Sequence, residues 1–155
     1  MTLKHIVYLS TMLTVAGGAM AGVDSASNAA AKANVNLPVT ALKWGATGVI
    51  GADGISALQA ATAYGDHSKG EHSTLIKMPA GFVSTVHTHT HDYYAVVISG
   101  VGTNASVGEK AIPLPPGSYW FQPGGKPHVT QCISTTECIF FVSQAAKFDY
   151  LPVAH

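Results

Sequence analysis

Hydrophobic and polar residues alternate through short runs over most of the chain after residue 72. Alternation with a period of two is typical of β-strands that bury one face. Glycine- and proline-containing turns interrupt these runs about every ten residues, a spacing that indicates an all-β sandwich or barrel. No stretch has a helical period. The expected strands cover residues 39–44, 55–64, 72–78, 82–89, 93–99, 101–107, 118–122, 129–133 and 138–143, with a terminal strand or tail at 147–153.

The first 21 residues have a different pattern. A mostly apolar run from Ile6 to Met20 ends at Ala19-Met20-Ala21, which offers a signal-peptidase site. The run is too short to cross a bilayer comfortably. We therefore predict a signal peptide at 1–21, export to the periplasm or the medium, and no stable membrane insertion after cleavage. An uncleaved membrane anchor is the alternative. Residues 22–37 are expected to form a flexible leader, and residues 38–155 a single domain.

Composition supports a folded domain and argues against a nucleic-acid partner. The 155 residues are 47% hydrophobic and 10% charged, which is typical of a globular domain rather than a disordered chain. The formal net charge is zero, and every basic residue is a lysine. Nucleic-acid binders usually carry basic excess, and arginine supplies the bidentate contacts to phosphate. We expect no nucleic-acid partner.

The two cysteines are close in sequence. Cys132 and Cys138 flank a turn-like segment, Ser134 to Glu137, between two strands that we expect to form a hairpin. In an oxidising compartment the two thiols would form a disulfide if the geometry permits it. The alternative is a pair of reduced cysteines that act as small apolar residues.

Three histidines stand at alternate positions in the segment before residue 95. Residues i and i+2 of a strand project from the same face. His87 and His89 are therefore expected to lie side by side, and His91 would continue the row if the strand extended that far. The apolar run from Ala95 to Ile98 follows. This arrangement predicts a strand, a turn and a second strand, with imidazoles directed toward the interior.

The segment from Gly81 to Gly100 resembles the first motif of the cupin superfamily. That motif has a glycine, then two histidines separated by one residue, and a closing glycine. The two histidines are here His87 and His89. The one departure is Tyr93, which stands where the motif usually has glutamate.

A segment that resembles the second cupin motif follows after a short gap. It contains Gly117, the Pro-Gly-Gly sequence at 123–125, and His128. Cys132 stands where the family usually has asparagine. The two motifs in this order and at compatible distances are far more specific than either alone. The likeness covers residues 72–145.

Within the superfamily, the chain is most similar to small cupin-like proteins of the domain-of-unknown-function 4437 type. The sequence around Trp44 and residues 116–128 carry that likeness. These proteins in turn resemble the cupin half of zinc-binding anti-sigma factors. The resemblance implies a cupin-type jelly roll or small antiparallel β-barrel with a metal in its interior, and it admits a homodimer.

Carried over by position, the metal ligands would be His87, His89 and His128, with Tyr93 in place of the acidic ligand. Neutral imidazole suits several divalent transition metals, and zinc, iron or manganese is expected. Asp92 is a competing fourth ligand. A set of His89, His91 and His128 also competes, because a shift of the strand register by two residues leaves the histidines on the same face of the sheet. Otherwise His91 is a turn residue or a proton relay, a role that Tyr93 shares.

The leading hypothesis is an exported metal-dependent cupin that acts on a small neutral organic molecule, with dioxygenase-type chemistry as one version. A binding or sensing cupin without catalysis is the second hypothesis, and the scarcity of acid–base groups favours it. A cupin barrel that has lost its metal is the third. His67 and His72 flank Gly70 in a polar segment and are predicted to be surface residues.

Overall fold

A computed structural model of the chain describes residues 34–154. The predicted signal peptide lies outside the described residues, as do residues 22–33 of the predicted leader. The described part contains one short 3-10 helix, η1 (Val39–Ala41), and the strands β1 (Gly45–Ile50), β2 (Ala57–Gly65), β3 (His72–Met78), β4 (His87–Thr88), β5 (Tyr93–Ser99), β6 (Gly102–Ser106), β7 (Tyr119–Gln122), β8 (His128–Cys132), β9 (Cys138–Gln144) and β10 (Leu151–Pro152). No helix among these residues is long and apolar enough to span a membrane.

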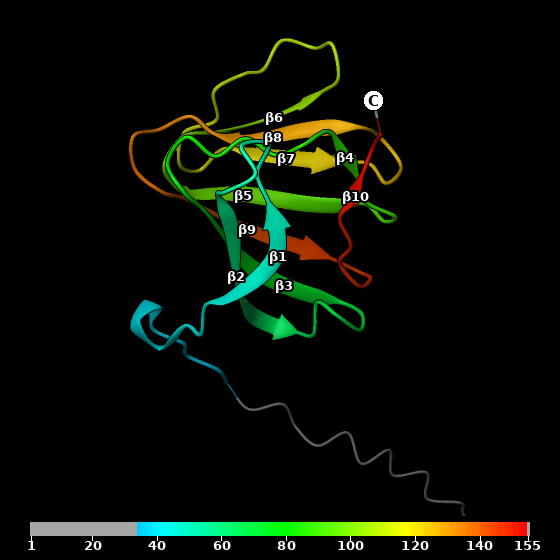
Figure 1. Ribbon diagram of the computed structural model, residues 1–155. Coiled ribbons are helices and arrows are strands. Elements are labelled where there is room, and N and C mark those ends of the chain that lie inside the picture. Colours follow the sequence, from blue (N-terminus) through cyan, green and yellow to red (C-terminus); the bar gives the residue numbers. More distant parts are fainter. Residues whose placement is uncertain (1–33, 155) are drawn as a thin grey trace, which may run out of the picture. The chain divides into compact units, whose positions relative to one another are not determined.

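The strands form two antiparallel sheets (Figure 1). One sheet has the order β1-β2-β3-β9-β5-β7, and the other has the order β10-β4-β8-β6. Figure 1 shows β10, in red at the end of the described chain, beside β4. The all-β prediction is therefore confirmed, and the arrangement is that of a single-domain jelly roll.

The alternating pattern places one face of each long strand in the core. Every second residue of β3 is buried, from His72 to Met78, and β9 follows the same rule. Phe82 and Phe140 are the largest completely enclosed apolar side chains, each 1% exposed. Burial of such side chains contributes about 1.5–3 kcal/mol each, so the two inner faces supply most of the stabilisation.

Two expected strands differ from the structure. Residues 39–44 do not form a strand: Val39–Ala41 is a 3-10 turn with no buried residue, and pairing begins only at Gly45. Residues 82–89 pair at an isolated bridge and then only over His87–Thr88. The hydroxyl of Ser84 accepts a hydrogen bond from the backbone N–H of Thr130 at 3.0 Å, beside two backbone hydrogen bonds, from Ser84 to Thr130 and from Cys132 to Phe82.

Cys132 and Cys138 form a disulfide, but the hairpin expected around them is wrong. β8 belongs to the four-stranded sheet and β9 to the six-stranded sheet, and the two do not pair. The disulfide therefore links the end of a strand in one sheet to the start of a strand in the other. Cys132 is 1% exposed and Cys138 is 0% exposed.

Candidate metal centre

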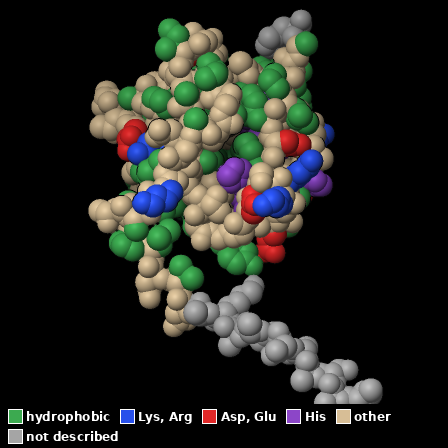
Figure 2. Space-filling model, turned by 60° about the horizontal axis from the view of Figure 1, so that its bottom comes forward, with side chains coloured by type: hydrophobic (Ala, Val, Ile, Leu, Met, Phe, Trp, Pro, Cys, Tyr) green, Lys and Arg blue, Asp and Glu red, His purple; other side chains and the backbone are tan. Residues whose placement is uncertain are grey.

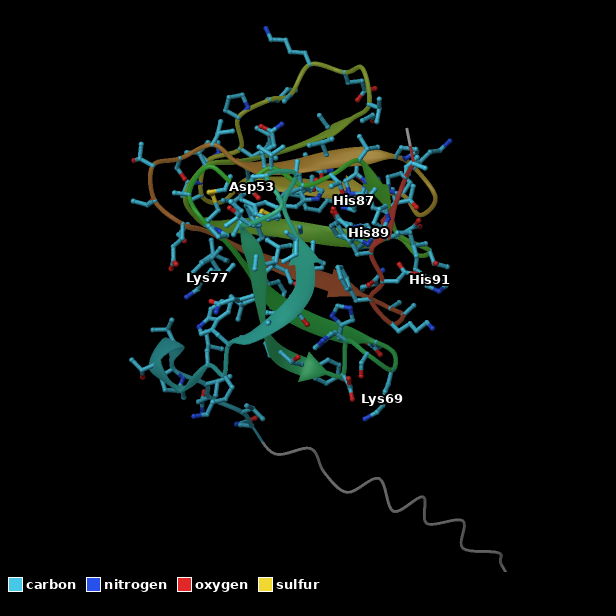
Figure 3. The ribbon with its side chains drawn as sticks, in the orientation of Figure 1. Asp53, Lys69, Lys77, His87, His89 and His91 are labelled. Carbon is cyan, nitrogen blue, oxygen red and sulfur yellow. A yellow bond between two sulfur atoms is a disulfide. The ribbon has the colours of Figure 1, made fainter. Side chains whose placement is uncertain are left out.

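Three histidines converge between the sheets. His87 in β4 and His128 in β8 are direct partners across an antiparallel pair, and His89 follows immediately after β4. Their ring centroids are 4.1 Å apart for His87 and His128, 5.0 Å for His87 and His89, and 5.3 Å for His89 and His128. Figure 3 shows His87 and His89 together, with His91 farther out.

The turn between Pro123 and Gly125 holds the two histidine segments in this register. The N–H of Gly125 donates to the carbonyl of His89 at 2.7 Å, and the N–H of Gly124 donates to the carboxylate of Asp92 at 2.7 Å. A Cβ on Gly124 would lie 2.6 Å from the carbonyl oxygen of Thr90, so only glycine fits without displacement of the backbone. The Pro-Gly-Gly sequence thus acts as a clamp between the two motifs.

Backbone carbonyls orient all three imidazoles. The Nδ1 atom of His87 donates to the carbonyl of Thr85 at 2.9 Å, and that of His128 donates to the carbonyl of Lys126 at 3.0 Å. The Nδ1 atom of His89 donates to the carbonyl of Asp149. A carbonyl only accepts hydrogen bonds, so each Nδ1 carries the proton and each Nε2 keeps a free lone pair.

The histidines are kept in the neutral form that metals bind. Burial, with the neighbouring His128 and His89, lowers the pKa of His87 to about 3. Burial also lowers the pKa of His128 to about 4 and shifts the pKa of His89 downward. Each side chain is at most 3% exposed. At neutral pH the site offers uncharged nitrogen donors in place of an imidazolium cluster.

The residues fit a divalent transition metal. The Nε2 atom of His128 is buried and has no hydrogen-bond partner in the part of the chain that the structure describes, which is costly in the absence of a ligand. The candidate ligand atoms of the three histidines lie within 4.8 Å of one another. Metal–nitrogen bonds of about 2.1 Å place two ligands at most about 4.2 Å apart. Small rotations of the imidazoles would therefore close the set around an ion.

Tyr93 lies beside the histidines, as its motif position implies. Its ring centroid is 5.1 Å from that of His89, and the side chain is 5% exposed. Burial raises the pKa of Tyr93 to about 12, and the indole N–H of Trp120 donates to its oxygen at 3.4 Å. The phenol stays protonated in this environment, so it is suited to hydrogen bonding within the cavity.

Asp92 and His91 are not part of the cluster. Both side chains are exposed. The carboxylate of Asp92 accepts the hydrogen bond from Gly124 described above, and the carbonyl of His91 accepts one from the side chain of Gln144 at 3.1 Å. Of the two competing histidine sets, the structure brings together His87, His89 and His128.

The chain end contributes residues that the sequence did not indicate. Besides the carbonyl of Asp149, the ring of Tyr150 stacks on His87 at 4.1 Å between centroids, and Phe148 packs against His89 at 5.1 Å. The aromatic residues in Phe148-Asp149-Tyr150 are the only sequence signal, and no motif marks them.

An apolar cavity of about 50 Å³ opens beside the imidazoles. Among residues 34–154, no acidic or lysine side chain lines it. Its lining includes Val49, Leu58, Ile76, Met78, Phe140, Val142, Tyr93, Thr130, His87 and His89. Figure 2 shows histidine side chains, in purple, on the face of the molecule in view, with acidic and lysine side chains beside some of them.

The prediction that His72 is a surface residue is wrong. His72 begins the central strand β3 and is 1% exposed. Its ring nitrogens contact the hydroxyl of Thr74 at 2.9 Å and the amide oxygen of Gln144 at 3.2 Å. Burial lowers its pKa, so it is a neutral core residue with both nitrogens satisfied. His67, on the neighbouring loop, is half-buried.

The two sheets form a cupin-type fold, with the three histidines enclosed between them. The comparison with solved structures supports this fold: an RmlC-like cupin protein from Ralstonia eutropha JMP134 has a TM-score of 0.58 and 21% identity, covering 77% of this chain and 73% of its own. More specifically, the chain belongs to the family described as domain of unknown function DUF4437, whose model matches residues 38–155. No protein in the curated set matches the chain.

Two enzymes are also similar in structure. The DMSP lyase DddQ from Ruegeria pomeroyi DSS-3 has a TM-score of 0.55 and 23% identity over 68% of this chain; the match spans only 57% of the lyase. The polyketide cyclase RemF from Streptomyces resistomycificus has a TM-score of 0.60 and 16% identity, covering 79% of this chain and 87% of its own. At these identities the likeness establishes the fold. None of the three is described as an anti-sigma factor, so that relationship stays a prediction.

Proposed function

We propose that this protein is a metal-dependent cupin that binds and transforms a small neutral organic molecule. The observation that carries the proposal is the set of three imidazoles whose Nδ1 atoms are occupied by carbonyls and whose candidate ligand atoms lie within 4.8 Å of one another. The orphaned Nε2 of His128 supports it further. Zinc, iron or manganese suits such a site.

The bound metal would supply Lewis-acid or oxygen-activating chemistry, since three protein ligands leave coordination positions open. The chain's own groups would do the rest. The apolar walls would exclude water and charged molecules, because no side chain in the lining can neutralise a charge. Tyr93 would hold a ligand oxygen through its O–H, which burial keeps protonated. His91 is exposed, so Tyr93 alone is the candidate proton relay.

Metal analysis tests the proposal directly. Wild-type protein is expected to carry about one divalent metal per chain, and His128→Ala to lose most of it while remaining folded by circular dichroism. His91→Ala is the matched control and is expected to keep the metal, because that side chain lies outside the cluster. Metal-free wild-type protein that does not take up zinc, iron or manganese would contradict the proposal.

A binding or sensing role without catalysis is the second candidate. It is favoured by the absence of a carboxylate among the described residues that line the cavity, which leaves His87, His89 and two tyrosines, Tyr93 and Tyr150, as the titratable groups there. Tightly held zinc without exchangeable ligand positions would support this candidate over an enzyme, whereas iron or manganese with exchangeable positions would support catalysis.

We also propose that the protein is exported. The apolar run from Ile6 to Met20 and the site at Ala19-Met20-Ala21 support this, and the disulfide between Cys132 and Cys138 suits an oxidising compartment. Mass spectrometry of protein from the periplasm or medium is expected to find a mature chain that begins at Gly22. Full-length protein in the cytosol alone would contradict it.

A further inference from the structure

Three hollows meet at the segment just before β10. The inner cavity of about 50 Å³ is lined by His87 and His89 of the metal site, and an adjoining cavity of about 100 Å³ is lined by residues that include His67, His72 and Thr74. An outer groove of about 590 Å³ is lined by residues that include His67 and Asp149. Two residues, Thr47 and Phe148, line all three.

Phe148 is the bulky member of this shared wall. Thr47 is small and fixed within β1: its hydroxyl donates to the carbonyl of Leu58 at 3.2 Å and accepts from the N–H of Val49 at 3.1 Å. The ring of Phe148 lies 5.1 Å from the ring of His89 and 6.5 Å from the ring of His72, measured between centroids. The ring therefore stands between the inner cavity and its neighbour.

The position of Phe148 is set by its backbone and by its neighbours. Its N–H donates to the carbonyl of His67 at 2.7 Å, and Asp149 and Tyr150 are attached to the metal site as described above. The residue lies outside any strand, and its ring is half-buried. The Phe148 side chain is held by packing alone, so it can be replaced by a shorter side chain without loss of the backbone hydrogen bond.

We propose that Phe148 determines the largest ligand that can reach the metal centre. An apolar cavity of about 150 Å³ accepts benzene, so the inner cavity of about 50 Å³ is too small for an aromatic ring. Loss of the Phe148 ring joins the inner and adjoining cavities and adds the volume of the ring itself. The substrate class that follows is a neutral molecule of only a few non-hydrogen atoms. This inference rests on the proposed metal centre.

Two hydroxamic acids with the same metal-binding group provide the test. Protein loaded with Co²⁺ is titrated with acetohydroxamic acid and with benzohydroxamic acid, and binding is followed by the visible spectrum of the cobalt. Wild type is expected to bind the phenyl compound at least tenfold more weakly than the methyl compound. Phe148→Ala is expected to reduce that ratio at least tenfold, and Phe148→Leu to give an intermediate ratio.

Phe141→Ala is the control, because Phe141 is also half-buried but lines none of the three hollows. It is expected to keep the wild-type ratio. Equal binding of both acids by wild type, or an unchanged ratio in Phe148→Leu with a wild-type cobalt spectrum, would overturn the inference. Failure of wild type to bind Co²⁺, or binding that His128→Ala leaves intact, would instead overturn the proposed metal centre.

Discussion

Gly124 occupies a position between the two motifs that leaves no room for a Cβ atom. A Cβ there would meet the carbonyl oxygen of Thr90 at 2.6 Å, and the turn that it belongs to is hydrogen-bonded to the carbonyl of His89 through the N–H of Gly125. We expect Gly124→Ala to cost about 1–3 kcal/mol of unfolding free energy, as overpacked sites do, and to weaken metal binding. Urea unfolding and metal titration measure the two effects.

Gly70→Ala is the matched control for this substitution. A Cβ on Gly70 meets nothing within 4 Å, and its φ is not in the left-handed region. The control is expected to unfold within about 0.5 kcal/mol of wild type. Equal stability of the two variants would show that the clamp at Gly124 does not constrain the site.

The buried histidines predict a pH dependence for the metal-free protein. The folded pKa values of His87 and His128, about 3 and about 4, lie below the ordinary value of 6.5. The unfolded chain therefore binds protons more readily, and stability is complete above about pH 6.5 and falls as the pH drops toward 4. Each histidine contributes about 1.4 kcal/mol per pH unit in this range.

Urea unfolding of chelator-treated protein at pH 7.5 and pH 5 measures this effect. The midpoint is expected to fall at pH 5, and His87→Gln is expected to reduce the drop. His91→Ala, which removes an exposed imidazole, is expected to leave the drop unchanged. A midpoint independent of pH would mean that the imidazoles are accessible to protons in the folded state.

At the scale of elements, the disulfide joins the two sheets near the strand that carries His128. Cys132 ends β8, which begins at His128, and Cys138 begins β9. Loss of a cross-link over such a short loop is expected to cost about 2 kcal/mol. We expect a Cys132→Ala/Cys138→Ala protein to melt at a lower temperature and to hold metal less tightly, because β8 loses its anchor.

Calorimetry with and without a reducing agent separates this effect from simple loss of packing. Reductant is expected to lower the melting temperature of wild type toward that of the double variant and to leave the variant unchanged. If reductant leaves the melting temperature of wild type unchanged, the lower melting temperature of the double variant is due to loss of the cysteine side chains and not of the cross-link.

The sequence predicted most strands and the central histidines for a physical reason. Strand parity places His87 and His89 on one face, and the second motif supplies His128 at the facing position. It did not predict Phe148, Asp149 or Tyr150, because their contacts depend on how the chain end returns to β4 some 60 residues away. Burial of His72 was missed because its polar neighbours suggested a surface loop.

The passage of the chain from one sheet to the other at the disulfide could also not be predicted from the local pattern. Two alternating runs joined by a polar turn look alike whether the strands pair with each other or cross between sheets. Here β9 pairs with β3 and β5, and β8 pairs with β4 and β6. Only the complete strand order distinguishes the two arrangements.

At the scale of the whole domain, the six-stranded sheet carries an exposed aromatic cluster on its outer face. Trp120 points inward, whereas Tyr94, Tyr119 and Phe121 are 52%, 56% and 42% exposed. The ring of Tyr94 lies 6.2 Å from that of Tyr119 and 5.1 Å from that of Phe121. Adjacent exposed aromatic side chains are typical of protein–protein interfaces, and β7 is an edge strand.

We therefore expect the homodimer that the sequence admits to form through this face. Wild type should sediment as a dimer, and Tyr119→Lys/Phe121→Lys should sediment as a folded monomer. In the dimer of the double variant, the two lysines of one subunit would lie against the same lysines of the other subunit, and their buried charges would repel. Ile55→Lys is the control: Ile55 is 84% exposed in a loop outside the cluster, so the dimer should persist. Monomeric wild type would mean that the cluster serves another partner, and a dimeric double variant would move the interface to a different face.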